Sequence, residues 1–346
     1  MSSSTAVSTA RGPAELRAAS RAVKAAQIRR TEAVRDPAFL ERIVLPHLPA
    51  TAGTWQTEVI QLDGSGAATV RVARGGSPPV FAKVFPGDDG PAVYEKLRAF
   101  RAAGFGAGSR YQAVEPLGWY PEADLLLCRG APGVAVSDLV HDEAAFTSGV
   151  AAAGAWLGRF HTSGLAIGAP KSLLVTGELL SLAKRLAKVV VAHPEHLDPA
   201  LEMIEVLDEL SHDTVDGLLS QSHGQYRPIH VFVRDDTVTV IDLDRSSPAD
   251  PARDVAEFLH RMRLAVHSAT GNMRRADGPT SAFLAAYADA GDPRHLTNLR
   301  FHWARYIAHS LTRKVKTGEA SPVANNAVYA LYRGEFDRVA AGRAEA

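Results

Sequence analysis

Residues 222–233 read S-H-G-Q-Y-R-P-I-H-V-F-V, and residues 238–259 read V-T-V-I-D-L-D-R-S-S-P-A-D-P-A-R-D-V-A-E-F-L. The apolar runs in these two segments predict strands over 231–233 and 238–243, joined by a hairpin turn. A helical pattern follows from Ala252. Polar side chains therefore collect at the strand ends of a loop–hairpin–helix unit, which is the most informative part of the chain.

Two carboxylates stand where the second strand of this hairpin ends. Asp242 is at the predicted strand end and Asp244 follows two residues later. Because side chains alternate along a strand, both carboxylates face one side if the strand continues through Asp244. Carboxylate oxygens suit Mg²⁺, which also takes waters and substrate phosphates. The pattern fits a magnesium site, but a solvated strand end capped by acidic residues explains it at least as well, because two acids at this spacing are common.

Composition limits the function classes. The chain has 346 residues, 46% of them hydrophobic, which is enough for a sizeable core and for more than one domain. Its 38 basic and 38 acidic residues balance, so net charge gives no reason to expect a nucleic acid or a membrane as partner. The single cysteine, Cys128, excludes an internal disulfide framework and fits a cytoplasmic location.

The first 48 residues read as a separate segment. Between Arg11 and Arg35 there are seven basic and two acidic residues on an alanine-rich background. We interpret Pro13–Val34 as a surface helix after a polar tail, and an amphipathic transit peptide is the alternative. A second short helix is expected over Pro37–Leu45.

The rest of the chain divides near residue 130. One helix and five strands are predicted before this point: Pro91–Ala103, and Trp55–Leu62, Thr69–Ala73, Val80–Phe85, Val114–Trp119 and Leu125–Cys128. Later residues are mostly helical, with helices expected over Glu143–Thr162, Leu179–Val191 and Pro199–Leu219. We therefore expect three parts, residues 1–48, 49–130 and 131–346, of which the second is a small α+β domain.

The informative stretch resembles the catalytic loop and metal-binding segment of the aminoglycoside phosphotransferase family. The family pattern is H-G-D-x-x-x-x-N, then a hairpin, then I-D, then G-D-P-x-x-D-L-A. This chain has His223-Gly224-Gln225, His230 at the Asn position, Ile241-Asp242, Ala249-Asp250-Pro251 and Asp254-Val255-Ala256. The resemblance implies an α+β, protein-kinase-like fold of two lobes: a small antiparallel-sheet N-lobe and a mostly helical C-lobe, here with an N-terminal helical extension.

The resemblance also implies ATP and Mg²⁺ as cofactors, and a nucleotide site in the N-lobe. Lys83 lies on the third predicted strand, where the family has its phosphate-pairing lysine, and Glu95 matches the glutamate that pairs with it. Gly64 and Gly66 lie where a loop would cover the nucleotide, although a plain hairpin turn explains them equally well. Cys128 falls in the stretch 127–130, whose backbone would meet adenine.

In the C-lobe the resemblance implies Asp242 as the principal metal ligand, assisted by His230 and Asp244. The catalytic residues would be His223, Gln225 and Asp242. Asp250 and Asp254 are better interpreted as struts that fix the loop through backbone hydrogen bonds.

Gln225 departs from the family pattern, because it replaces the catalytic carboxylate. An amide cannot take the acceptor's proton, but it can orient a nucleophile. Loss of a general base typically costs roughly 10²–10⁴ in rate. The substitution predicts a slow enzyme, a substrate-assisted enzyme or no enzyme. His230 in place of Asn is less damaging, because imidazole can also bind a metal.

We therefore expect a phosphotransferase that acts on a hydroxyl of a small molecule or of a peptide Ser or Thr. The alternative is a nucleotide-binding pseudokinase that serves as a scaffold for a partner enzyme. Substrate contacts are expected in residues 165–220 and in the C-lobe helices.

Three weaker features of the sequence could indicate other functions. The basic, aromatic-rich stretch Arg294–Lys316 is interpreted as a solvated face over an aromatic core edge, with an anionic or peptide groove or RNA binding as alternatives. His193-Pro194-Glu195-His196 reads as a surface turn, because its spacing and its proline do not fit a helical zinc motif. Ser181–Lys184 and Lys316–Gly318 resemble motifs of penicillin-recognising enzymes, but the S-D-N element between them is absent.

Overall fold

The computed structural model describes residues 36–48, 53–62, 68–85, 89–171, 175–316 and 322–343. The expected helix over Pro13–Val34 and the two glycines Gly64 and Gly66 lie outside these ranges. The chain forms two compact units. The first runs to Ala102 and includes Val114–Gly130, and the second comprises Ala103–Ala113 and Ala131–Ala346.

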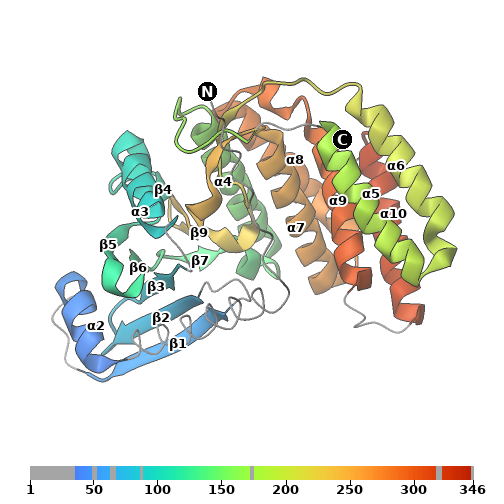
Figure 1. Ribbon diagram of the computed structural model, residues 1–346. Coiled ribbons are helices and arrows are strands. Elements are labelled where there is room, and N and C mark those ends of the chain that lie inside the picture. The colour runs from blue at the N-terminus through green and yellow to red at the C-terminus, as the bar shows by residue number, and fades with distance from the viewer. Residues whose placement is uncertain are drawn as a thin grey trace, which may run out of the picture. The chain divides into compact units, whose positions relative to one another are not determined.

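The first unit is built on a five-stranded antiparallel sheet of order β1-β2-β3-β6-β5 (Figure 1). Its strands and helices are β1 (Trp55–Leu62), β2 (Ala68–Arg74), β3 (Val80–Val84), β5 (Pro116–Tyr120), β6 (Leu125–Arg129), α2 (Pro37–Val44) and α3 (Asp89–Phe100). The predicted strands and both predicted helices are present, with ends that differ by a few residues.

Helix α2 closes the core on one face of this sheet. The Asp36 side chain caps the helix by accepting from the Ala38 N–H at 3.1 Å. Buried residues of α2 pack with the inward residues of β2, β3 and β6: Leu40, Ile43, Val44, Val70, Val72, Val80, Ala82, Val84, Leu125 and Leu127. Burial alternates along β3, so Lys83 projects from the face opposite to this core.

The second unit contains two small sheets. One has the order β4-β10-β9-β7, in which β4 (Tyr111–Ala113) runs parallel to β10 (Thr237–Val240) and β9 (Val231–Arg234) runs antiparallel to β10 and to β7 (Val134–Ala135). The other pairs β8 (Ser220–Ser222) with β11 (Ser247–Ala249). Because β4 pairs with β10, residues 103–113 belong to the second unit although the sequence suggested the first.

Helices make up most of the second unit: α4 (Glu143–His161), α5 (Val175–Ala192), α6 (Leu197–Ser211), α7 (Ala252–Thr270), α8 (Asp277–Ala290), α9 (Leu299–Lys316) and α10 (Pro322–Ala340). Helix α6 ends at Ser211 and not at Leu219 as expected. None of the helices in the described ranges is long and apolar enough to cross a membrane.

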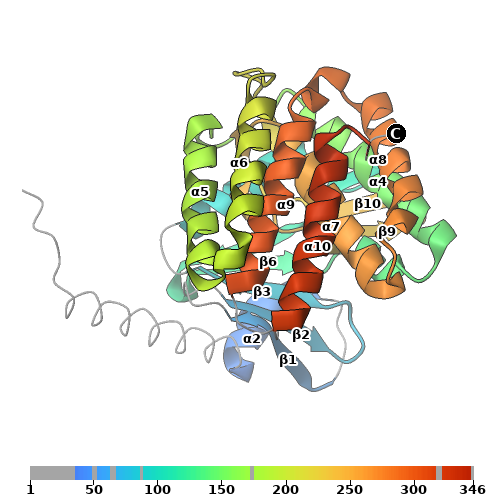
Figure 2. The ribbon, with the colours of Figure 1, turned by 90° about the vertical axis from the view of Figure 1, so that its right-hand side faces the viewer.

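Helix α9 agrees in part with the expected solvated basic face over an aromatic core edge, but one of its arginines is buried. It packs against α5, α6, α7 and α10 (Figures 1 and 2). Phe301, Trp303 and Ile307 are buried, and so is Arg305, whose guanidinium is 2.6 Å from the Glu178 carboxylate. Arg305 is therefore paired inside the unit, whereas Arg294 and Arg300 are exposed.

Candidate functional site

The loop that opens the site is fixed by a buried carboxylate. Asp254, in the first turn of α7, accepts hydrogen bonds from the backbone N–H groups of His223 and Gly224, and its carboxylate lies 3.3 Å from His161 Nε2. Burial opposes ionisation of Asp254. The hydrogen bonds and charge interactions with His161 and His223 nevertheless keep the pKa of Asp254 below its ordinary value. Asp254 thus fixes the loop as a buried, negatively charged side chain.

Gly224 is required by the shape of this loop. Its φ of 83° is left-handed, and a Cβ at this position would lie 2.7 Å from the Arg245 carbonyl oxygen. The loop therefore lies directly against the turn that follows Asp242, and this contact brings the two halves of the family motif together.

His223 and His230 form the floor of the site. His223 is fully buried, and its Nε2 donates to the Ile241 carbonyl at 2.9 Å. The two imidazoles are stacked, with centroids 5.8 Å apart and 11° between their planes. His223 therefore holds the loop to the hairpin, which is a structural contribution.

His230 presents a lone pair to Asp242. The carbonyl of Gln225 can only accept, so at 3.0 Å it receives the Nδ1–H of His230. Burial and the neighbouring His223 lower the pKa of His230 to about 4, which leaves its Nε2 unprotonated near pH 7. This nitrogen lies 3.6 Å from Asp242 Oδ2. Two acceptors that face each other at this distance are suited to a shared cation.

This pair is compatible with Mg²⁺ on chemical grounds. Mg²⁺ is commonly bound by one or two protein ligands and completes its shell with waters and substrate phosphates. The described residues contain no group of three or more His, Cys, Asp or Glu side chains that could hold a metal. The pair could therefore supply only part of a coordination shell, as expected for a site completed by a nucleotide.

The condition for an alignment of Asp242 with Asp244 is not met, because the strand does not continue through Asp244. Strand β10 ends at Val240, Asp242 adopts a left-handed conformation with φ 63°, and Leu243–Arg245 form a 3-10 turn. Alternation along a strand therefore does not reach Asp244. The unusual backbone of Asp242 is of the kind that persists at functional sites when surrounding contacts enforce it.

Gln225 is held by an arginine that the sequence analysis did not single out. In the orientation that satisfies its neighbours, the Gln225 amide oxygen accepts from both terminal nitrogens of Arg227, at 3.1 and 2.6 Å. Arg227 Nε donates to Glu257 at 2.7 Å. The Tyr306 hydroxyl donates to the same carboxylate at 3.1 Å. Glu257 is only 4% exposed, and a carboxylate buried to this extent needs a partner.

The first unit contains the residues that the sequence predicts to bind the nucleotide. Lys83 lies on β3, and Cys128 lies opposite Phe81 in the neighbouring strand β6. Glu95 is on the exposed face of α3, 64% exposed, with its carboxylate 3.2 Å from Arg98. This arrangement gives no support to a Lys83–Glu95 pair, which stays a prediction. In the stretch 127–130, whose expected contact with adenine stays a prediction, the N–H of Gly130 donates to the Pro79 carbonyl at 2.9 Å.

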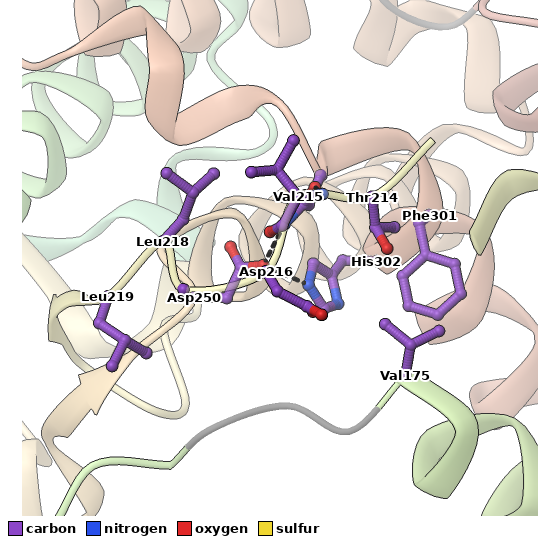
Figure 3. A pocket seen from close by; sticks show the side chains of 11 residues that line it. Val175, Thr214, Val215, Asp216, Leu218, Leu219, Asp250, Phe301 and His302 are labelled. Carbon is purple, nitrogen blue, oxygen red and sulfur yellow. Dashed lines mark hydrogen bonds and ion pairs between the residues drawn. The ribbon is translucent and has the colours of Figure 1, made fainter. Parts of the chain in front are cut away.

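A cavity of about 250 Å³ lies at the far end of the β8–β11 pair (Figure 3). Asp250 is at its wall and accepts from Asn298 at 2.7 Å and His302 Nε2 at 3.0 Å. Because a carboxylate can only accept, His302 donates through Nε2, and burial lowers the pKa of this imidazole. Asp250 therefore joins α7 to α9, which is a strut role similar to that of Asp254.

Solved structures with the same fold come from several phosphotransferases. A choline/ethanolamine kinase family protein from Mesorhizobium loti is 13% identical, with a TM-score of 0.57 over 91% of this chain and 97% of its own. Choline kinase from Cryptosporidium parvum is 10% identical, with a TM-score of 0.56 over 92% and 97%. Spectinomycin phosphotransferase, solved with ADP and spectinomycin, is 11% identical, with a TM-score of 0.58 over 89% and 97%.

No curated protein sequence matches the chain significantly. The profile of the phosphotransferase enzyme family, however, matches residues 59–305, a range that contains β3, the catalytic loop, the His230–Asp242 pair and α7. The α+β fold agrees with the kinase-like fold of the solved neighbours. The chain belongs to the phosphotransferase enzyme family.

Proposed function

We propose that the protein transfers the terminal phosphoryl group of ATP, in the presence of Mg²⁺, to a hydroxyl group of a small molecule. The observation that carries this proposal is the pairing of the His230 lone pair with the Asp242 carboxylate at 3.6 Å. Membership of the family supports the reaction class, and the small-molecule acceptors in the neighbours' names support the acceptor class.

The site residues of the second unit have different roles in this proposal. Asp242 and His230 would hold Mg²⁺, and the ion would neutralise charge on the transferred group. Asp254 keeps the backbone of His223 and Gly224 in place through buried hydrogen bonds. In the first unit, Lys83 remains the proposed phosphate-binding residue, because it projects from β3 on the face opposite to the core.

The proton of the acceptor hydroxyl has no carboxylate to receive it at position 225. Phosphoryl transfer passes through a loose transition state, in which little negative charge has to develop on the attacking oxygen, and positioning contributes most of the catalysis. We therefore expect a slow reaction in which a phosphate oxygen or solvent finally takes the proton.

The metal-dependent step is tested with Asp242→Ala. In wild type, ATP with Mg²⁺ should raise the melting temperature more than ATP alone, because a ligand that binds only the native state stabilises it. The variant should lose this Mg²⁺-dependent increment. Loss of a residue that supports a metal ligand typically lowers metal affinity or activity by about 10–100-fold. Loss of the ligand itself should therefore reduce transfer to choline or spectinomycin by at least about 100-fold.

Asp236→Ala is the matched control, because Asp236 is an exposed acid in the turn of the same hairpin. It should behave as wild type in both measurements. An unchanged Mg²⁺ increment in Asp242→Ala would overturn the assignment of the metal site. A wild-type protein that ATP does not stabilise, with or without Mg²⁺, would overturn the proposed function.

One observation favours a second candidate, a nucleotide-binding protein without transferase activity. The amide that replaces the catalytic carboxylate is bound to Arg227, so its oxygen is occupied by another partner. A protein of this kind would show the Mg²⁺-dependent stabilisation but no transfer to any hydroxyl acceptor. The same two measurements therefore separate the two candidates.

A further inference from the structure

Helices α5 and α6 form an antiparallel pair in the second unit. Only the short segment 193–196 joins them, and such a connection places two helices side by side in opposite directions. Both helices pack against α9 (Figures 1 and 2). Their buried side chains are Leu182, Leu186, Val189, Ala200, Met203 and Leu207. The exposed residues of 180–191 and 197–209 form the opposite surface of the pair, which we call the α5–α6 face.

The α5 side of this face is basic. Lys184, Arg185 and Lys188 are exposed, and they follow one another at spacings of one, three and four residues. Side chains three and four residues apart lie on one side of a helix. No acidic residue occurs between Glu178 and Glu195. The exposed stripe of α5 therefore carries positive charge alone.

The α6 side of the face is acidic. No Lys or Arg occurs between Lys188 and Arg227. Glu202 lies 2.9 Å from Arg333 of α10, and this ion pair marks the edge of the acidic stripe. The exposed acids of α6 are Asp198, Glu202, Glu205, Asp208 and Glu209. A positive stripe thus runs beside a negative stripe on the same helix pair.

Large apolar side chains are exposed among these charges. Val191 is 84% exposed, and Leu201 lies one helical turn from Glu205. The exposed apolar residues of the face are Leu180, Val191, Leu197 and Leu201. Single apolar residues are ordinary on a protein surface, but several that gather on one face are typical of a contact surface.

This charge pattern is complementary to a second copy of itself. A twofold axis parallel to the two helices places α5 of each copy opposite α6 of the other, so each positive stripe meets a negative one. An axis across the helices would bring like charges together, which is unfavourable. Lys184 is eight residues before the end of α5 at Ala192, and Glu205 is eight residues after the start of α6 at Leu197. The two side chains are therefore about level, and Lys184 of one copy faces Glu205 of the other.

We propose that the α5–α6 face binds a second copy of this chain through such a twofold contact. The 15 residues of α6 span about 22 Å, so a face two helices wide belongs to the small class of specific interfaces. We expect a reversible dimer with a Kd on the order of 1–100 µM.

Sedimentation velocity of the full chain at increasing concentration measures this equilibrium. In about 50 mM salt the mass should rise from monomer to dimer through the micromolar range, and about 500 mM salt should raise the Kd by about tenfold, because salt screens the two stripes. A chain that stays monomeric at about 500 µM in low salt would show that the face binds no second copy.

Charge reversal identifies the face. Lys184→Glu and Glu205→Lys each place two like-charged contacts in a twofold dimer, so each should raise the Kd by at least about tenfold. An equimolar mixture of the two variants should dimerise again, because every facing pair is then of opposite charge. A variant that dimerised poorly because it had unfolded would not be rescued in this way.

Arg274→Glu and Asp236→Lys are the matched controls, because they make the same changes of charge at exposed positions outside α5 and α6. Both should dimerise as wild type does. Dimers that persist in Lys184→Glu and Glu205→Lys would overturn the proposed face. A mixture of these two variants that stays monomeric would overturn the twofold pairing of Lys184 with Glu205.

Discussion

Asp254 shows at the scale of one residue how a buried charge organises the site. It is 2% exposed and accepts from two consecutive backbone N–H groups, of His223 and Gly224, as well as contacting His161. Three donors converge on one carboxylate, which explains why it stays ionised at a buried position. The loop conformation thus depends on a residue about thirty positions away in the sequence.

Asp254→Asn tests this dependence. Asparagine has one acceptor oxygen, and its NH₂ group would face an N–H donor, so one buried donor loses its partner. We expect the free energy of unfolding to fall by roughly 2–4 kcal/mol, measured by urea denaturation. Asp236→Asn, an exposed acid, should change it by less than about 0.5 kcal/mol. Equal stability of the two variants would contradict the strut role.

At the scale of elements, the contact between α4 and α8 depends on glycines in α4. A Cβ on Gly154 would collide with the Phe283 carbonyl oxygen, and one on Gly158 would lie 2.6 Å from the Tyr287 carbonyl oxygen. The backbones of the two helices therefore approach more closely than any side chain allows. Tyr287, at this contact, is bonded to His161, so the helix pair also supports the group that contacts Asp254.

Gly154→Ala should destabilise the protein, although alanine is the better helix former by about 1 kcal/mol. The obstructing atom is backbone, so α8 has to move, and we expect a loss of about 1–3 kcal/mol in the free energy of unfolding. Gly334→Ala, in α10, is the control, because a Cβ there meets nothing within 4 Å. It should stabilise by about 0.5–1 kcal/mol. Chemical denaturation should give a lower free energy of unfolding for Gly154→Ala and a higher one for Gly334→Ala than for wild type.

At the scale of the whole molecule, a buried imidazole couples stability to pH. His260 of α7 is 2% exposed and bonds to Ser310 of α9 at 2.7 Å. Burial and the charges of Arg261, His309 and Arg263 lower the pKa of His260 from 6.5 to about 3. Between these two values only the unfolded state binds the proton, so the free energy of unfolding decreases as pH falls below 6.5.

His260→Gln should reduce this pH dependence. Glutamine can keep the bond to Ser310 but does not titrate. Between pH 7 and pH 5 the wild type should lose on the order of 1–2 kcal/mol more than the variant does. Urea denaturation at several pH values gives the two slopes. If the slopes are the same, His260 is already exposed to protonation in the native state.

Local residue patterns were enough to locate many of the strands and helices. Alternation and helical periodicity located the strands of the first unit and the hairpin β9–β10, since these signals depend only on neighbouring residues. The family followed from motif spacing, which the family profile confirms over residues 59–305. The short strands β4, β7, β8 and β11 were missed, because two or three residues give too little alternation to recognise.

Contacts between segments that are distant in the sequence fix which side chains meet. The aromatic and basic stretch of α9 reads as a surface helix by composition, yet four helices cover it. Arg227 became important only through Glu257, thirty residues away, and Gln225 acquired its orientation from this contact. Strand β10 ends at Val240, so alternation along it does not reach Asp244. Burial and charge pairing depend on contacts between distant segments, which local periodicity does not encode.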